Sequence, residues 1–150
     1  MKNLPKSAIT EKSFALGLRI VRLARDLMHH QREYELGRQV LRSGTSVGAN
    51  VVEAQGGISR ADFSHKMSIA YKEALETKYW LNLLVQSELI SQETFDETME
   101  ATDECSRILF KILESTGRIT RGPKNQIQEE QSPYLSRMDF LFEDELTSNP

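Results

Sequence analysis

Apolar residues recur at helical spacing along most of the first 117 residues, and this periodicity constrains the fold more than any other feature. In the stretch from Thr10 to about His30, they follow one another at steps of four, three and four. The members of this first stripe are Leu16, Ile20, Leu23 and Leu27. Similar stripes run from Leu36 to Ala54, from about Arg60 to about Glu88, and from Ser91 to Gly117. Because side chains at such steps share one face of an α-helix, the pattern predicts four amphipathic helices.

The connections between these stripes hold residues that end one helix and begin the next. Gly56 and Gly57 follow the second stripe, and glycine adopts the left-handed conformation that often ends a helix. Ser59 and Asp62 resemble a capping box with Asp in place of the usual Glu, and Ser91 is a suitable N-cap. No segment alternates like a strand, and such short connections turn each helix back on the one before it. We therefore predict an all-α, antiparallel up-down-up-down four-helix bundle.

The helical pattern stops at Gly117, and we divide the chain there. Residues 1–9 are predicted to be a leader, residues 10–117 the four-helix bundle, and residues 118–150 a mostly disordered tail. Within the tail, residues 134–146 form an apolar cluster flanked by acids, which is suited to docking on a groove. The candidate docking residues are Tyr134, Leu135, Met138, Phe140, Leu141 and Phe142.

The sequence indicates a protein of the cytoplasm. It shows neither the apolar core of a signal peptide near its start nor a run of about 18 apolar residues that would span a membrane. Its single cysteine, Cys105, has no disulfide partner and no metal-ligand spacing around it. We expect a soluble, single-domain protein with a buried or half-buried thiol in a reducing compartment.

Residues 44–48, GTSVG, match the G-x-S-x-G pattern of the nucleophile elbow in serine hydrolases. Such an elbow needs a strand before the serine, whereas the residues before Ser46 have helical periodicity. His65 is the only histidine after Ser46, and no predicted sheet would position it. We therefore interpret Ser46 as a residue within a helix and predict no enzymatic activity.

The sequence also predicts no metal or cofactor site. His29 and His30 are adjacent on a helix and point about 100° apart, so they cannot chelate one ion together. The chain has no Glu-x-x-His pair of the kind that di-iron bundles use, and no Gly-Lys-Ser/Thr phosphate loop.

The predicted helix around Ser46 has a glycine side and a polar edge. Gly37, Gly44 and Gly48 fall on one side, where close packing of another helix would offset a propensity cost of up to about 1 kcal/mol each. The polar edge has two interpretations: a solvated surface, or a hydrogen-bonded seam between helices or subunits. The residues on this edge are Gln39, Ser43, Ser46, Asn50 and Glu53.

Charges are unevenly distributed in this chain of net charge −3. Residues 1–60 hold ten Lys/Arg against five Asp/Glu, for +5, and residues 61–117 hold five against eleven, for −6. Five arginines in the first region have three interpretations: pairing with acids within an assembly, binding of nucleic-acid phosphates, or simple solvation. They are Arg19, Arg22, Arg25, Arg38 and Arg42. The candidate acids are Glu73, Glu76, Glu93, Asp96, Glu97, Glu100, Asp103 and Glu104.

Two aromatic residues, Tyr79 and Trp80, lie where the inner stripe of the third predicted helix meets its flank. One interpretation is that they belong to the core. The other is that Trp80 anchors an interface between subunits, because large rings with one polar atom favour half-buried positions.

Two runs of sequence together resemble a known family. LRSGTSVGANVVEA, followed by DFSHKMSIAYKEALETKYWLNLL, is similar to the four-helix bundle proteins first noticed as products of intervening sequences in bacterial 23S rRNA genes. The resemblance covers about residues 10–116. It is carried by Leu41-Arg42-Ser43, Ser46, Gly48-Ala49-Asn50, Glu53, and Glu73 through Glu76 to Tyr79-Trp80.

This resemblance implies an antiparallel bundle, assembly into a ring of five and no known enzymatic activity. The interface or motif residues are then Arg42, Ser46, Asn50, Glu53, Glu73, Glu76 and Trp80. A similar fold serves as the basic accessory protein of diversity-generating retroelements, which binds nucleic acid and a reverse transcriptase. The present chain differs from it in its acidic net charge and its long tail.

From the residues and the resemblance together, we expect a non-enzymatic scaffold or adaptor that forms a cyclic homo-oligomer, a pentamer by resemblance. The five arginines are its candidate surface for RNA or DNA. The alternative is a protein-interaction module whose tail docks on a neighbouring copy or on another protein.

Overall fold

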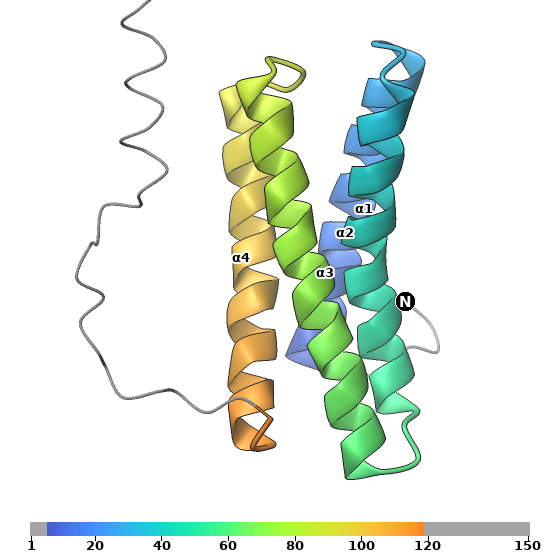
Figure 1. The fold of residues 1–150 in the computed structure, drawn as a ribbon, viewed down its shortest axis with the longest axis vertical. Coiled ribbons are helices and arrows are strands. Elements are labelled where there is room, and N and C mark those ends of the chain that lie inside the picture. Colours follow the sequence, from blue (N-terminus) through green and yellow to red (C-terminus); the bar gives the residue numbers. More distant parts are fainter. Residues whose placement is uncertain (1–5, 119–150) are drawn as a thin grey trace, which may run out of the picture. The chain divides into compact units, whose positions relative to one another are not determined.

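Four α-helices make up the part of the chain that the computed structural model describes, residues 6–118. They are α1 (Ala8–His29), α2 (Tyr34–Gln55), α3 (Arg60–Gln86) and α4 (Gln92–Ser115). No strand occurs within residues 6–118, and the helices pack into a bundle (Figure 1). The predicted all-α four-helix bundle is therefore confirmed. The first five residues of the predicted leader, and the tail from residue 119 with its docking segment 134–146, lie outside the described residues.

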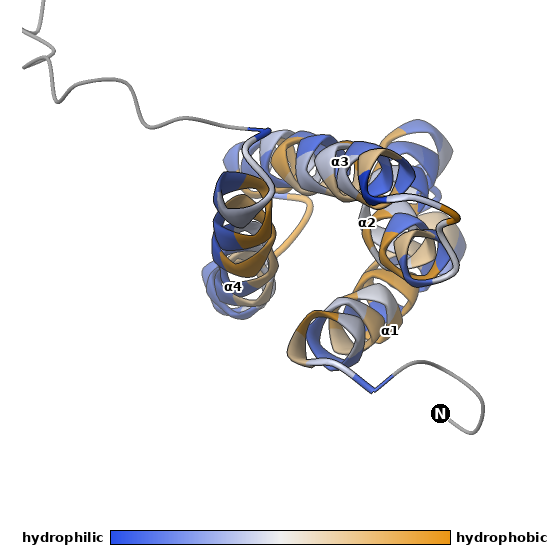
Figure 2. Ribbon diagram, turned by 90° about the horizontal axis from the view of Figure 1, so that it is seen from below, coloured by the Kyte–Doolittle hydropathy of each residue, from blue (hydrophilic) through white to orange (hydrophobic). Residues whose placement is uncertain are grey.

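Each helix packs against two others. The α2 helix contacts both α1 and α3, while α4 contacts α3 and, less extensively, α1. The connections from α1 to α2 and from α3 to α4 lie at one end of the bundle, and the connection from α2 to α3 lies at the other (Figure 1). Seen along the bundle, apolar parts of the ribbons turn toward the interior (Figure 2).

The core is built from the predicted apolar stripes. All four members of the first stripe are buried, and α2, α3 and α4 add their own inward faces. The largest fully buried apolar side chains are Leu16, Ile20, Leu27, Val40, Val47, Val51, Met67, Leu81, Leu84, Leu109 and Leu113. Burial of one such side chain contributes about 1.5–3 kcal/mol, so the shared apolar interior holds the bundle together. None of the four helices in residues 6–118 is long and apolar enough to cross a membrane.

Two predicted helix starts are confirmed by their caps. The Ser59 hydroxyl accepts a hydrogen bond from the backbone N–H of Asp62 at 3.1 Å, and the Ser91 hydroxyl accepts one from the N–H of Thr94 at 3.1 Å. These bonds satisfy donors that have no partner inside the first turn of a helix. The Asp62 carboxylate completes the box differently from the usual pattern, because it accepts from the N–H of Ile58 at 3.3 Å.

The end of α2 differs from the prediction in its backbone conformation. The helix ends at Gln55 as expected, but Gly56 has a φ of −90° and is not left-handed. Left-handed conformations occur instead at Arg32, Glu88 and Gly117, with φ of 59°, 58° and 71°. At Gly57 a side chain would have little space, since a Cβ there would lie 3.0 Å from the Ala54 carbonyl oxygen.

The glycine side of α2 packs against α1, as predicted. A Cβ at Gly44 would lie 2.6 Å from Cγ1 of Ile20, and one at Gly37 would lie 2.8 Å from Cγ of Met28. At Gly48 it would stand 3.4 Å from the carbonyl oxygen of Ser13. The missing side chains thus let the two helices approach closely, which offsets the low helix propensity of glycine.

Candidate functional site

The polar edge of α2 meets α3 at two points. The buried hydroxyls of Ser43 and Thr77 lie 3.1 Å apart as a hydrogen-bonded pair. Farther along, Glu53 forms an ion pair with Lys66, which raises the pKa of that lysine. Asn50 turns back to its own helix, where its amide donates to the backbone oxygen of Ser46 at 2.9 Å. The edge is therefore a seam between helices at Ser43 and Glu53, but not at Asn50.

Next to the Ser43–Thr77 pair, Glu76 joins residues from both helices. One of its carboxylate oxygens, Oε1, lies 2.7 Å from Nη2 of Arg42 on α2. The same oxygen accepts a hydrogen bond from the indole Nε1 of Trp80, one turn farther along α3, at 3.2 Å. Charge-assisted bonds of this kind are stronger than bonds between neutral groups. Arg42, Glu76 and Trp80, three of the motif residues, thus form one cluster on the surface of the bundle.

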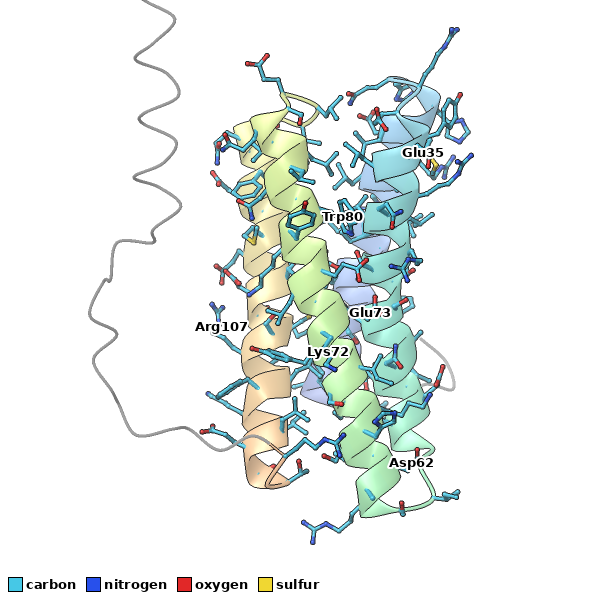
Figure 3. All side chains as sticks on the ribbon, in the orientation of Figure 1. Glu35, Asp62, Lys72, Glu73, Trp80 and Arg107 are labelled. Atoms are coloured by element: carbon cyan, nitrogen blue, oxygen red, sulfur yellow. The ribbon has the colours of Figure 1, made fainter. Side chains whose placement is uncertain are left out.

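Glu73 lies on α3, one turn before Glu76 (Figure 3). Its Oε2 atom is buried and has no hydrogen-bond partner within the described part of the chain. Burial raises the pKa of this carboxyl, and the nearby charge of Glu76 raises it further, while Arg42 lowers it. An unpartnered buried carboxylate oxygen is costly, so this position resists ionisation.

Exposed apolar residues flank this cluster on α3. Leu75 and Tyr79 lie four residues apart on the helix and are 43% and 58% exposed. The Tyr79 ring meets the half-buried Trp80 ring edge to face, with 5.0 Å between centroids. The polar tip of Trp80 is held by Glu76, and its apolar body borders solvent. Sequence reasoning singled out Trp80 and Tyr79 here but missed Leu75.

Three of the five candidate arginines are already paired within the chain. Arg19 binds Glu97 on α4, Arg42 binds Glu76, and Arg38 lies 2.8 Å from Glu35 on its own helix. Arg38 also lies over the ring of Tyr34, 5.9 Å from the centroid. Arg19, Arg38 and Arg42 therefore already have acidic partners in the same chain.

Arg22 and Arg25, by contrast, have no ion pair or hydrogen bond within residues 6–118. Both are exposed on α1 and line a surface hollow of about 460 Å³. The hollow is completed by Asp26, His29 and His30. The Asp26 carboxylate is engaged with His30 at 2.7 Å and with Gln31, which lowers its pKa.

The acids of α4 find most of their partners in the same chain. Four of the six that were considered for pairing within an assembly hold a basic residue at close range. The pairs are Lys12–Glu104, Arg19–Glu97, Lys78–Asp103 and Arg107–Glu100. Less opposite charge therefore remains for contacts between copies than the composition indicates.

Ser46 lies in the middle of α2, a continuous helix from residue 34 to 55. The strand that a nucleophile elbow requires is not found in residues 6–118, and no hydrogen bond there joins Ser46 to His65. Among the described residues, no group of three or more His, Cys, Asp or Glu side chains is arranged to hold a metal ion. Cys105 is buried as expected, and burial raises its pKa to about 11.

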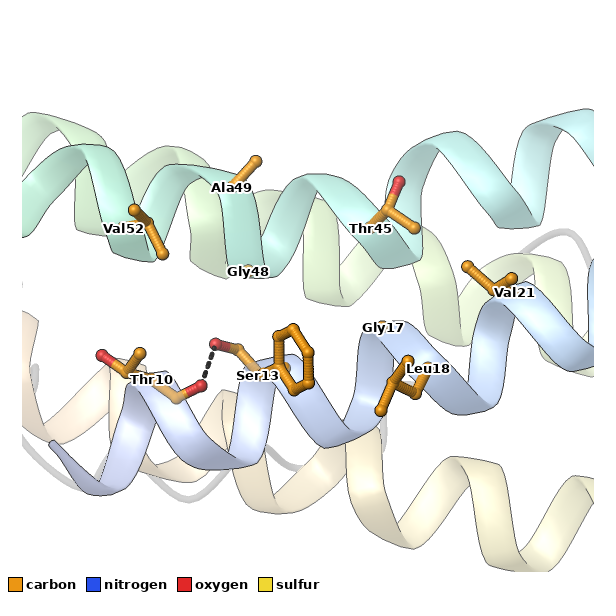
Figure 4. A pocket seen from close by; sticks show the side chains of 10 residues that line it. Thr10, Ser13, Gly17, Leu18, Val21, Thr45, Gly48, Ala49 and Val52 are labelled. Atoms are coloured by element: carbon orange, nitrogen blue, oxygen red, sulfur yellow. Dashed lines mark hydrogen bonds between the residues drawn. The ribbon is translucent and has the colours of Figure 1, made fainter. Parts of the chain in front are cut away.

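A groove between α1 and α2 was not predicted from the sequence. It has a volume of about 400 Å³ and is lined almost entirely by apolar atoms. Its lining residues are Thr10, Ser13, Phe14, Gly17, Leu18, Val21, Thr45, Gly48, Ala49 and Val52 (Figure 4). The feature of the sequence that could have indicated this groove is Gly17, a residue without a side chain between Phe14 and Leu18 on the outer side of the first stripe.

Comparison with known proteins finds both a family and solved structures that match the chain. A family described as 23S rRNA-intervening sequence protein matches residues 5–111. A solved structure from Bacteroides thetaiotaomicron, described as a protein of unknown function from the S23 ribosomal protein family, is 42% identical, with a TM-score of 0.70. That match covers 71% of the present chain and 99% of the other chain. No curated protein matches significantly.

Proposed function

The chain belongs to the family of 23S rRNA-intervening sequence proteins, and on that premise we propose that it is a non-enzymatic, oligomeric scaffold of the cytoplasm that binds nucleic-acid phosphates. The observation that carries the proposal is the pair Arg22 and Arg25. They are exposed on one helix, three residues apart, and neither has an acidic partner within residues 6–118. Residues three apart on a helix share a face, so one phosphate backbone can meet both guanidinium groups.

Among the paired arginines, Arg19 extends this surface, because it lines a second hollow together with Arg22. Arg19 lies one turn before Arg22, and Arg38 and Arg42 lie on the neighbouring helix. Their ion pairs are largely exposed, with side-chain exposures of 43%, 63% and 63% for these arginines. Exposed pairs contribute only about 0–1 kcal/mol, so an arginine can leave its carboxylate for a phosphate at little cost. Each phosphate contact releases counterions and thereby strengthens binding at low salt.

The scaffold in this proposal is an antiparallel bundle whose copies close into a ring. Two contacts between α1 and α4 support opposite helix directions: Lys12 pairs with Glu104, and Arg19, farther along α1, pairs with Glu97, earlier on α4. For the ring, exposed Leu75 and Tyr79 beside Trp80 provide an apolar surface that a second copy can cover.

Light scattering of the full chain tests the assembly. The resemblance implies five copies, which at 17.2 kDa per chain gives about 86 kDa. Replacement of Leu75 and Tyr79 by Glu should lower the measured mass while helicity by circular dichroism is retained. A mass of 17.2 kDa for the unmodified chain would contradict the ring.

Nucleic-acid binding is tested by mobility shifts with RNA and DNA at about 50 mM salt, where phosphate contacts are strong. The double variant Arg22→Glu/Arg25→Glu should lose most of the shift. On duplex, the slope of log K against log salt should fall by about 1.8, at about 0.9 for each lost contact. The control Lys72→Glu/Lys111→Glu changes the net charge by the same amount on α3 and α4. Absence of a shift, or an equal loss in both variants, would refute the phosphate surface.

A further inference from the structure

The α1/α2 groove is an apolar hollow that no residue from 6 to 118 covers. On its α1 wall, Phe14 and Leu18 are 40% and 47% exposed, and Ala49 and Val52 stand opposite on α2. Gly17 leaves the floor open, since an added Cβ would meet no atom within 4 Å (Figure 4). Large exposed apolar side chains around an open hollow are typical of a surface that a partner covers.

The polar atoms that line this groove are already engaged inside the protein. The Thr10 hydroxyl lies 2.8 Å from that of Ser7, and the Thr45 hydroxyl donates to the Leu41 carbonyl at 2.7 Å. The Ser13 hydroxyl donates to the Thr10 carbonyl at 3.3 Å. A polar ligand would therefore find few free partners, whereas an apolar side chain can enter without displacing a hydrogen bond.

A matching apolar ridge, formed by Leu75 and Tyr79, lies on α3. These two side chains are 43% and 58% exposed and, being four residues apart, share one face of the helix. Within residues 6–118, four of the six large exposed apolar side chains belong to the groove or to this ridge. Exposed apolar surface is thus concentrated on two different parts of the bundle, and a contact of the groove with itself would leave the ridge uncovered.

We propose that the ridge of one copy inserts into the α1/α2 groove of the next copy, with Leu75 against Phe14 and Tyr79 against Leu18. The inference rests on the assembly under the proposed function and names the two surfaces that form it. Because ridge and groove are different surfaces, each copy uses its ridge on one neighbour and its groove on the other. Such a contact repeats from copy to copy until a rotation closes it into a ring.

The spacing of the two surfaces agrees with this contact. Leu75 and Tyr79 are four residues apart, as are Phe14 and Leu18, which corresponds to about 6 Å along each helix. In the antiparallel bundle of the proposed function, α1 and α3 run in the same direction. Two copies side by side in the same orientation therefore bring both apolar pairs together at once.

Contacts inside the chain indicate the relative heights of ridge and groove along the bundle. Through α4, Lys12 of α1 and Lys78 of α3 are at nearly the same height, because they pair with adjacent acids. The pairs are Lys12–Glu104 and Lys78–Asp103. This route places Leu75 at the height of Thr10, below the centre of the groove.

The route through α2 gives a height on the other side of the groove centre. Gly44 faces Ile20 on α1, and Arg42, two residues earlier, pairs with Glu76 on α3. The ridge is then at the height of Val21. The α1 wall of the groove lies between the two values, so ridge and groove are at about the same height. A contact without displacement along the helices closes into a ring, whereas a displaced one grows into a filament.

The overall distribution of charge favours contact between these unlike surfaces. Residues 1–60, which carry the groove, have a net charge of +5, and residues 61–117, which carry the ridge, have −6. Groove-to-groove and ridge-to-ridge contacts would bring like charges together. A ridge-to-groove contact brings opposite charges together, which favours this pairing over the other two.

Two further charges support the same register. Glu11 stands three residues before Phe14, and Lys72 stands three residues before Leu75, each on the face of its apolar neighbour. Neither has an ion pair or hydrogen bond of its side chain within residues 6–118. When Leu75 meets Phe14, Lys72 meets Glu11. An exposed pair adds little affinity, but it helps to fix the register that the apolar side chains stabilise.

Disulfide trapping in the full-length chain tests the proposal. The double variant Glu11→Cys/Lys72→Cys places one exposed thiol beside the groove and one beside the ridge, and it removes no apolar contact. In the described bundle α1 and α3 do not contact each other, so a disulfide between these positions must join two copies. The native Cys105 does not compete, because it is buried and its pKa is raised to about 11. Under mild oxidation we expect a ladder of linked chains on a non-reducing gel.

The matched control is Glu11→Cys/Gln86→Cys. Gln86 is exposed on the same face of α3, fourteen residues beyond Lys72, which is about 21 Å along the helix. A disulfide requires Cα atoms within about 7 Å of each other. We expect the Glu11→Cys/Lys72→Cys pair to react at least about tenfold faster than this control. The single variants Glu11→Cys and Lys72→Cys should stay largely unlinked, because the contact joins unlike surfaces.

Light scattering of the unmodified chain separates this inference from the assembly on which it rests. A mass of 17.2 kDa would overturn both. If the chain assembles but the control pair reacts as fast as the proposed pair, the assembly stands and this contact is wrong. Linking of a single variant as fast as the double variant would overturn it too, since like surfaces would then meet.

Discussion

A Cβ atom on Gly44 would stand 2.6 Å from Cγ1 and 2.8 Å from Cγ2 of Ile20. Carbon atoms in proteins pack at about 3.5–4.0 Å, so the glycine hydrogen occupies the only space available there. Ile20 is fully buried, and its β-branched side chain has little rotational freedom. The distance between α1 and α2 is therefore set at this contact by the absence of a side chain on α2.

Gly44→Ala is expected to destabilise the bundle. Alanine raises helix propensity by up to about 1 kcal/mol, but overpacking of a core typically costs about 1–3 kcal/mol. We expect a net loss of about 1–2 kcal/mol in the free energy of unfolding, measured by urea denaturation. An unchanged midpoint would mean that α1 and α2 separate more easily than the packing around Ile20 indicates.

Gly17→Ala is expected to have the opposite effect. This glycine also lies within a helix, but an added Cβ would meet nothing within 4 Å. Only the change in helix propensity then remains, a gain of about 0.5–1 kcal/mol. The same denaturation experiment should show a higher midpoint, and the pair of variants separates packing from propensity.

These two glycines show what the sequence reveals and what it hides. Helical spacing determines which residues share a face, so the burial of the first stripe from Leu16 to Leu27 was predicted correctly. The room that is available for a side chain depends on how the neighbouring helix packs. Residue spacing along one helix does not contain that information. The same holds for helix ends. The left-handed conformation expected at Gly56 is absent there and occurs instead at Gly117, Arg32 and Glu88. The path by which the chain returns to the next element determines which residue adopts this conformation.

The same limit applies to the candidate site. The family resemblance placed Arg42 and Glu76 among the motif residues, but their 2.7 Å contact depends on the register between α2 and α3. The groove was missed because it consists of space left around Gly17 by two helices. Pairing of Arg19 with Glu97 in the same chain was also hidden, since composition does not distinguish contacts within a chain from contacts between chains.

Glu73→Gln is expected to stabilise the bundle at neutral pH. The pKa of Glu73 is raised above the ordinary glutamate value of 4.5, first by burial and then by Glu76. A raised pKa of an acid in the folded state favours the protonated form, so its stabilising contribution is present at low pH and lost as pH rises through the folded pKa. Glutamine mimics the protonated form. Its advantage over Glu73 should therefore be seen at pH 7, shrink as pH falls through the raised folded pKa, and be lost below about pH 4.5.

Thermal unfolding of both proteins between pH 3 and pH 8 measures this difference. Glu76→Gln serves as the control. The Glu76 carboxylate binds Arg42 and Trp80, so this variant should lower the midpoint of unfolding at neutral pH. A lower midpoint for Glu73→Gln at pH 7 would show that the Glu73 carboxylate has an ionic partner after all.

Cys105 is expected to resist alkylation in the folded protein. Desolvation by burial raises its pKa to about 11, and the nearby Glu104 adds to this effect. The reactive thiolate is then scarce at pH 8, and the side chain is fully enclosed. Iodoacetamide should modify it at least about tenfold more slowly in buffer than in denaturing urea, as followed by mass spectrometry. Equal rates would indicate that the α4 side of the core opens frequently.

The coupling between Arg42 and Glu76 is expected to exceed that between Arg38 and Glu35. Both are arginine–glutamate pairs, at 2.7 Å and 2.8 Å, but the Glu76 side chain is 33% exposed, and the Glu35 side chain is 82% exposed. Glu76 is also held in place by the Trp80 indole, so less side-chain entropy is lost when Arg42 binds.

Double-mutant cycles with Arg→Met and Glu→Gln should give about 0.5–1 kcal/mol for the Arg42–Glu76 pair and about 0.2–0.5 kcal/mol for the Arg38–Glu35 pair. The first value should fall less on addition of salt, because partial burial reduces screening. If the two pairs give equal coupling and equal salt dependence, Trp80 does not preorganise Glu76.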